Sequence, residues 1–184
     1  MKKSDMKKNL SKSVVLVGMP GAGKSKIGTA LAGILATDFI DADREIERAA
    51  GLTVAEIFAK HGEQEFRRLE RDVIARLLKA DICVLSLGGG AFINAETRAN
   101  IKQTAISVWL KVGQDLLVER VERRDSRPLL QGGDKRGKIA ALQAEREPLY
   151  AEADLIVECD DRPVAENARR VADSIRAALT TQIP

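Results

Sequence analysis

The amino-acid sequence predicts an α/β protein in which a parallel sheet is covered by helices on both faces. Apolar, strand-like runs recur at residues 13–18, 38–41, 82–87, 105–110 and 154–159, helical patterns separate them, and a glycine-rich loop joins the first run to the first helix. This alternation is typical of parallel sheets, because each crossover helix packs on the sheet. With 184 residues, the chain is long enough for one domain with a full core.

The first strand-like run ends in a phosphate-binding loop. The segment Gly18–Ser25 fits the pattern G-x-x-x-x-G-K-[ST] at every fixed position, and an amphipathic helix follows it. Such loops turn backbone N–H groups toward the phosphates of a nucleoside triphosphate. Lys24 is placed to reach the β- and γ-phosphates, and the Ser25 hydroxyl is placed to bind Mg²⁺. A chance match in a chain of this length arises roughly 1% of the time, which disfavours an unrelated glycine-rich turn.

Two carboxylates follow the second strand-like run. Asp41 and Asp43 point to the same side if the chain stays extended. Sheets of this class bind ligands beyond the carboxyl ends of their strands. One acid is therefore expected near the metal ion and the other near a substrate hydroxyl. Asp43 could also cap the helix that begins at Arg44, and the two roles are compatible.

A pair of opposite charges lies on an amphipathic helix expected from Glu63 to Ala80, after a capping box at Thr53. Glu70 falls within the apolar stripe of this helix and Arg67 at its edge. A buried carboxylate needs a partner, and Arg67 is placed to pair with it. The pair either holds the guanidinium ready for an anionic ligand or is purely structural, and the sequence leaves both open.

Three consecutive glycines, Gly88, Gly89 and Gly90, follow the third strand-like run. They either let the backbone approach a small ligand closely or form a flexible turn. Their place after a buried strand favours the ligand. This strand ends without the acid that commonly binds Mg²⁺ in phosphate-loop enzymes, so the acid must lie elsewhere.

The stretch 124–137 departs from the alternation, because three glycines, a proline and six charges surround only two leucines. We expect a lid that closes over the triphosphate and brings in arginines, with a plain surface loop as the alternative. A helix from about residue 138 should end at Pro148, which disfavours helical geometry at Glu147. Pro163 should open a last helix that runs to about residue 180.

The positive charge is concentrated at the N-terminus. Residues 1–13 carry five lysines and one aspartate, so the rest of the chain has a net charge of −1. We expect a flexible basic tail over residues 1–12 and a single domain over 13–184. The near-neutral body has six aromatic residues, which argues against nucleic-acid binding, and no run approaches the ~20 apolar residues of a membrane span. A cytoplasmic location is expected.

Together these segments resemble shikimate kinases over about residues 13–176. The phosphate loop is common to many families, whereas the other elements in this order are specific. The matching elements are Gly18–Ser25, Phe39–Asp43 with Ile46 and Glu47, Gly62-Glu63 with Phe66-Arg67 and Glu70, Leu85–Gly90, Arg127–Leu130, and Arg146 with Pro148-Leu149-Tyr150.

The resemblance implies a phosphate-loop kinase fold with three αβα layers, a five-stranded parallel sheet, substrate-binding helices at about 44–80 and a lid at about 124–137. The implied reaction transfers the γ-phosphoryl group of ATP to the 3-hydroxyl of shikimate, with Mg²⁺ as cofactor, in the pathway to chorismate and the aromatic amino acids. The expected partners are the small molecules ATP and shikimate, and a monomer is expected.

The resemblance also implies roles for individual residues. Asp43 would hold the hydroxyl to be phosphorylated, Lys24 and Arg127 would complete the catalytic set, and Asp41 and Ser25 would act on Mg²⁺. Arg124, rather than Arg123, would face the adenine opposite Arg162. The implied substrate-binding residues are Asp43, Arg67, Gly88, Gly89, Gly90 and Arg146, and the ATP-binding residues are Gly21, Ala22, Gly23, Lys24, Ser25, Lys26, Arg124, Arg127 and Arg162.

Two other functions fit part of the pattern. Another small-molecule kinase of the same fold, such as a gluconate kinase, would share the loop and the lid but would not need a rigid pair of arginines for a ring carboxylate. A non-catalytic nucleotide-binding module is the second alternative. The presence of Lys24, Ser25, Asp43 and Arg127 counts against it.

Overall fold

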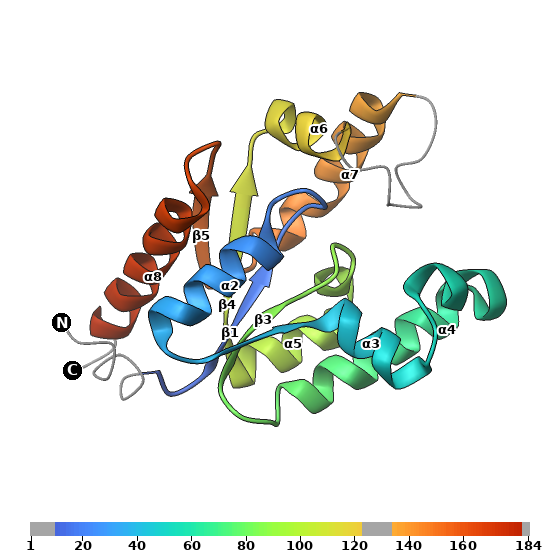
Figure 1. Ribbon diagram of the computed structural model, residues 1–184, viewed down its shortest axis with the longest axis horizontal. Helices are drawn as coiled ribbons and strands as arrows, with labels where there is room; N and C mark the ends of the chain where they lie inside the picture. Colours follow the sequence, from blue (N-terminus) through green and yellow to red (C-terminus); the bar gives the residue numbers. More distant parts are fainter. Residues whose placement is uncertain (1–9, 123–133, 182–184) are drawn as a thin grey trace.

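A computed structural model describes residues 10–122 and 134–181, in which strands and helices alternate (Figure 1). The predicted strand-like runs all appear as strands. These are β1 (Ser13–Val17), β2 (Asp38–Asp41), β3 (Cys83–Ser86), β4 (Ala105–Val112) and β5 (Leu155–Cys159). The helices are α2 (Lys24–Leu35), α3 (Ala42–Ala50), α4 (Val54–Leu77), α5 (Ala95–Thr104), α6 (Gln114–Glu122), α7 (Lys135–Tyr150) and α8 (Val164–Thr181), with a short 3₁₀ helix η1 (Ala91–Ile93).

The strands form one parallel sheet in the order β2-β3-β1-β4-β5. In the central strand, Val15 pairs with Leu85 of β3 and with Ser107 of β4. Crossovers between parallel strands are right-handed, so the direction of a connection decides the face on which its helix lies. Helix α2 leads from the central strand β1 to the edge strand β2 and lies on one face of the sheet. The connections that contain α4, α5 and α7 run in the opposite direction across the sheet, so these helices lie on the other face. Helix α8 packs against α2, which completes the three layers visible in Figure 1. The predicted fold class is confirmed.

The core lies around β1 and β3, whose residues are buried along the whole length of both strands. Helix α2 covers them with Ile27, Leu31 and Leu35, which are at most 4% exposed and repeat at helical spacing. Since all strands run in the same direction, the loops that follow β1, β2 and β3 meet at one edge of the sheet. This edge carries the residues that the sequence analysis singled out.

Helix α7 differs from the prediction at both ends. It begins at Lys135, with Asp134 as its N-cap, so residues 135–137 belong to the helix and not to the expected lid. It also continues through Pro148 to Tyr150, although the sequence predicted an end at the proline. The lost backbone hydrogen bond is offset by tertiary contacts, because Arg146 and Tyr150 are both anchored in the core.

The N-terminal boundary is also different from the prediction. Leu10 is 8% exposed and packs in the core, and Lys12 Nζ donates to the Gln103 carbonyl at 3.2 Å. The predicted tail of residues 1–12 is therefore too long, and residues 1–9 lie outside the described residues. Across 10–122 and 134–181, no helix combines the length and the apolar character needed to cross a bilayer.

Candidate active site

The phosphate loop joins β1 to α2 at the carboxyl edge of the sheet. Gly18, Gly21 and Gly23 have φ angles of 138°, 90° and 92°, a region that residues with a side chain rarely adopt. The side chain of Lys24 is buried, and its Nζ donates hydrogen bonds to the carbonyls of Gly18 (2.7 Å) and Met19 (3.1 Å). The ammonium group is thus held against the backbone of the loop.

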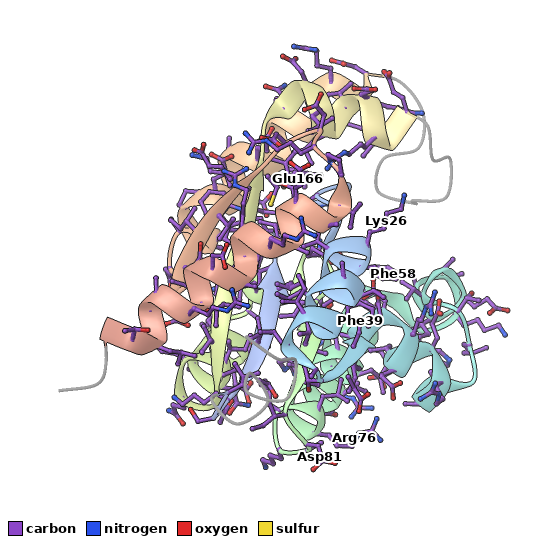
Figure 2. The ribbon with its side chains drawn as sticks, turned by 60° about the vertical axis from the view of Figure 1, so that its left-hand side comes forward. Lys26, Phe39, Phe58, Arg76, Asp81 and Glu166 are labelled. Carbon is purple, nitrogen blue, oxygen red and sulfur yellow. The ribbon has the colours of Figure 1, made fainter. Side chains whose placement is uncertain are left out.

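The first turn of α2 continues the loop. Ser25 and Lys26 are exposed, and Figure 2 shows the Lys26 side chain extending away from the helix. The Ser25 hydroxyl donates to Asp41 Oδ2 at 2.8 Å. The two residues that were expected to act on a metal ion, one from α2 and one from the end of β2, are therefore in direct contact.

Asp41 and Asp43 lie where β2 turns into α3, and their local structure corrects the prediction. Asp41, not Asp43, is the N-cap of α3, and its Oδ1 accepts from the Asp43 backbone N–H at 3.2 Å. The chain becomes helical at Ala42, so the assumption of an extended chain was wrong. Asp43 instead lies in the first turn, where the helix N-terminus favours its negative charge. Both carboxylates still line the same cavity.

Helix α4 carries the predicted pair of charges. Gly62, with φ 80° and ψ 173°, breaks the helix, and the part that follows ends at Leu77 rather than at the predicted Ala80. Arg67 Nη1 donates to Glu70 Oε2 at 2.8 Å, and Arg67 Nη2 donates to Glu63 Oε1 at 3.2 Å. The predicted contact between Arg67 and Glu70 is confirmed, and the second carboxylate fixes the guanidinium further.

The pKa values of both members of this pair are shifted by their surroundings. Burial raises the pKa of the Glu70 carboxyl, against the opposing effect of Arg67. Burial lowers the pKa of the Arg67 guanidinium, but the carboxylates of Glu70 and Glu63 outweigh this effect, and its pKa is raised. Arg67 is therefore a permanent cation whose side chain is 27% exposed, which leaves part of it open to a ligand.

The three glycines after β3 touch charged side chains from several elements. A methyl group on Gly88 would lie 2.7 Å from Asp43 Oδ1, and one on Gly90 would lie 2.8 Å from both Nη atoms of Arg67. A side chain at either position would therefore push the Asp43 carboxylate or the Arg67 guanidinium away from the loop. The backbone of Gly88 and Gly90 thus forms a floor on which the Asp43 carboxylate and the Arg67 guanidinium come together.

Arg146 and Tyr150, from the end of α7, both reach Gly89. Arg146 Nη1 donates to the Gly89 carbonyl at 3.1 Å, and the Tyr150 hydroxyl donates to the same oxygen. Arg146 is 6% exposed, and its buried Nε has no hydrogen-bond partner among the described residues. A buried charged donor in this condition is uncommon, and a ligand beside the glycine loop is one partner that it could bind.

A cavity of about 430 Å³ runs along this edge of the sheet. It connects the phosphate loop, the two aspartates and the glycine loop. Arg67, Gly90 and Arg146 do not line the cavity, although both arginines contact the glycine loop beside it. Ala22, within the phosphate loop, is buried and does not line it either. The predicted residues that line the cavity are Gly21, Gly23, Lys24, Ser25, Lys26, Asp41, Asp43, Gly88, Gly89 and Arg162.

One end of the cavity is formed by α6, the start of α8 and the loop before it. Arg162 and Arg120 both line this end, and no pattern in the sequence had indicated Arg120. Arg120 Nη2 donates to the Asp160 carbonyl at 2.9 Å, and Arg120 Nη1 lies 3.5 Å from the Ala22 carbonyl in the phosphate loop. Its place just before the expected lid is the only signal that could have found it.

Most of the expected lid lies outside the described residues, as do Arg123, Arg124 and Arg127. The described residues contain no group of three or more His, Cys, Asp and Glu side chains that could enclose a metal ion. Mg²⁺ in phosphate-transfer sites does not need such a group, because phosphates and waters supply most of its ligands.

The comparisons with known proteins agree with this geometry. A family model described as shikimate kinase matches residues 20–179. A shikimate kinase from Bradyrhizobium diazoefficiens is 49% identical over 169 residues, which cover 92% of this chain and 82% of that protein. The structure of a shikimate kinase from Acinetobacter baumannii in complex with shikimate superposes with a TM-score of 0.90 at 34% identity over the whole of both chains.

A gluconokinase from Sinorhizobium meliloti superposes less closely, with a TM-score of 0.64 at 18% identity over 92% of this chain and 94% of that one, and this similarity concerns the fold alone. The family match, by contrast, spans nearly the whole domain and agrees with the specific elements of the sequence. The chain therefore belongs to the shikimate kinase family, and it is an ATP-dependent phosphotransferase that acts on shikimate.

Proposed function

We propose that the edge formed by the loops after β1, β2 and β3 transfers the γ-phosphoryl group of ATP to the 3-hydroxyl of shikimate. The observation that supports this most strongly is the convergence of Arg67 and Arg146 on the glycine loop, next to Asp43. Two guanidiniums fit a substrate carboxylate, and a neighbouring carboxylate fits a substrate hydroxyl. A substrate that carries both groups on one small ring would contact all three residues.

Shikimate is held mainly by its carboxylate. Arg67 is fixed by Glu63 and Glu70, and Arg146 is fixed by Gly89, so both guanidiniums have their positions before the substrate arrives. The buried Nε of Arg146 supplies a donor that the carboxylate can use. The backbone of Gly88, Gly89 and Gly90 supports the ring, because the lack of side chains lets a small ligand approach it closely.

The phosphoryl transfer depends on positioning and on charge. Asp43 accepts the proton of the 3-hydroxyl while the hydroxyl oxygen attacks the γ-phosphorus, and the bond from the γ-phosphorus to the bridging oxygen of ADP breaks. Lys24 and the N–H groups of the loop 21–25 stabilise the charge on the phosphate oxygens. Asp43 and Lys24 line the same cavity, which supports their action on one reacting group.

Mg²⁺ is the cofactor that we propose. The Ser25 hydroxyl and the Asp41 carboxylate offer two hard oxygen donors 2.8 Å apart, and these donors fit the ion. Ser25 would bind it directly and Asp41 through water. When bound with ATP, Mg²⁺ neutralises the charge that develops on the β- and γ-phosphates.

The nucleoside of ATP is assigned to the end of the cavity formed by Arg120 and Arg162, because planar guanidiniums stack well on flat bases. The roles predicted for Arg124 and Arg127, adenine contact and γ-phosphate contact, stay predictions, as do the cytoplasmic location and the monomeric state. Size-exclusion chromatography with light scattering would test the last of these.

A coupled assay of ADP release tests the proposed function. The purified chain with ATP and Mg²⁺ should release ADP with shikimate and not with gluconate, other polyols or nucleoside monophosphates. The product should carry one phosphate on the 3-oxygen, which phosphorus and proton NMR identify. Turnover with gluconate in place of shikimate would instead support the other kinase of this fold.

A further inference from the structure

We propose that Asn167 is a positioning residue for the nucleoside of ATP: its side-chain amide fixes the main chain of residues 160–162 and thereby holds Arg120 and Arg162 in place. The inference rests on the proposed assignment of this end of the cavity to the nucleoside. It concerns a residue of α8 that neither binds phosphate nor contacts the shikimate side.

Asn167 is 2% exposed, and its side-chain amide forms hydrogen bonds with the loop after β5. Its Oδ1 accepts from the Asp160 backbone N–H at 3.4 Å, and its Nδ2 donates to the carbonyls of Asp160 (3.3 Å) and Arg162 (3.2 Å). One amide thus binds both ends of a three-residue segment. A buried amide that forms hydrogen bonds with the backbone N–H and C=O groups of a loop makes that loop rigid.

Both arginines of the cavity depend on this segment. Arg120 Nη2 donates to the Asp160 carbonyl at 2.9 Å, which is the oxygen that Asn167 also binds. Arg162 Nε pairs with Asp160 Oδ2 at 3.1 Å, and the Arg162 backbone N–H donates to Asp160 Oδ1 at 3.2 Å. A movement of Asp160 would therefore move both guanidiniums at once. The Asp160 carboxylate also lies 3.5 Å from the Arg170 guanidinium.

Rigidity matters here because Arg162 is open to solvent. The Arg162 side chain is 51% exposed, so its own packing does not hold it in one rotamer. An arginine that is free in the unbound protein loses side-chain entropy when a base stacks on it, whereas an arginine that is already fixed loses less. The amide of Asn167, which lines the same end of the cavity, would thus raise the affinity for the nucleoside by fixing the two arginines.

Only an amide can make these bonds in this geometry. Asparagine offers one acceptor for the Asp160 N–H and two donors for the two carbonyls. An aspartate would keep the acceptor but would place a negative charge against both carbonyl oxygens, and an alanine would leave all three backbone groups without this partner. Asn167→Asp and Asn167→Ala therefore disturb the segment in two different ways, and at least one of them should keep the fold.

The experiment compares ATP with inorganic tripolyphosphate, which carries the phosphates without the nucleoside. In both variants we expect the KM for ATP to rise about tenfold, which matches the loss of one or two buried hydrogen bonds. The inhibition constant of tripolyphosphate against ATP and the KM for shikimate should stay within about twofold of the unaltered chain. Ser174→Ala is the matched control, because it removes a side-chain bond to the Arg170 carbonyl from the same helix, and it should change none of these constants.

An unchanged KM for ATP in a folded variant would overturn the inference, and so would a parallel rise in the tripolyphosphate constant, since the residue would then act on the whole cavity. The proposed function itself is tested by a different measurement: it fails if the unaltered chain does not phosphorylate shikimate. Asn167→Ser, which keeps a hydroxyl at this place, serves as the third variant if both others unfold, and it should show a smaller rise in the same constant alone.

Discussion

The hydroxyl of Tyr150 donates a hydrogen bond to the main-chain carbonyl of Gly89, a residue 61 positions earlier in the chain. The guanidinium of Arg146 donates to the same oxygen. Tyr150 is 1% exposed, and its ring lies 5.9 Å from that of Trp109 and 6.4 Å from that of Phe92. The aromatic contacts fix the phenol, and the phenol fixes the loop on which the shikimate site is proposed to be built.

Tyr150→Phe should therefore weaken shikimate binding selectively. The substitution removes one buried hydrogen bond and keeps the ring, so we expect the KM for shikimate to rise by about two- to tenfold. The KM for ATP should change little, because the nucleoside is proposed to bind at the other end of the cavity. Steady-state kinetics with each substrate varied in turn measures both values. Equal rises in the two constants would mean that the hydroxyl stabilises the fold and does not position the loop.

The same phenol provides a direct test of its burial. Tyr150 is the only tyrosine of the chain, so the near-ultraviolet absorbance of tyrosinate reports on this group alone. Burial raises its pKa to about 12, against the opposing effect of Arg146. The folded chain should titrate near this value, and the chain in denaturant near the ordinary 10.

The sign of the linked stability effect follows from these two values. Between pH 10 and 12 the folded state binds more protons than the unfolded state, so the free energy of unfolding should fall as the pH rises through this range. Below pH 10 the contribution is fully present. Urea denaturation at several alkaline pH values measures how the free energy of unfolding depends on pH. In Tyr150→Phe, which has no phenol, the fall between pH 10 and 12 that is due to this group should be absent.

Local patterns in the sequence predicted much of the fold. The capping box at Thr53 needs only residues within one helical turn, and it is present. The contact between Arg67 and Glu70 spans three residues on one helix, and it too was predictable from spacing. Such features depend on interactions that the chain makes with its own neighbours.

The features that were missed depend on distant segments. The bond from Arg120 to the Asp160 carbonyl joins residues 40 positions apart, and no local pattern indicates it. The continuation of α7 past Pro148 depends on the anchoring of Tyr150 by Gly89. The choice of Asp41 as N-cap depends on the residue at which the strand gives way to the helix, and boundaries of this kind are the least predictable part of a sequence.

Asp43→Asn should reduce turnover at least 100-fold while it leaves the KM for ATP within about threefold, because an amide cannot take the hydroxyl proton. Asp43 lies in the first turn of α3, where the loss of one negative charge costs little stability. Asp72→Asn, on the exposed face of α4, is the control and should keep full turnover. Normal turnover of Asp43→Asn would remove this residue from the role of base.

The two proposed carboxylate-binding arginines allow a test that separates shikimate from other substrates. Arg67→Lys and Arg146→Lys keep the positive charge but lose the planar fork that binds a carboxylate through two parallel hydrogen bonds. Each such bond contributes roughly 1.5–3 kcal/mol, so the KM for shikimate should rise at least tenfold in either variant. Arg68→Lys is the matched control, because Arg68 is the next residue on α4 and forms ion pairs with the exposed side chains of Glu65 and Asp72.

The amide of shikimate completes this test, because it has the same ring and hydroxyls without the negative charge. It should be a poor substrate for the unaltered chain, and it should lose little more with Arg67→Lys or Arg146→Lys, since the bond that these variants weaken is already absent. The KM for ATP should stay constant throughout, as neither arginine lines the cavity of the phosphate loop. If the acid and the amide react equally well with the unaltered chain, Arg67 and Arg146 do not bind a carboxylate, and the convergence of both residues on the glycine loop must have a structural cause instead.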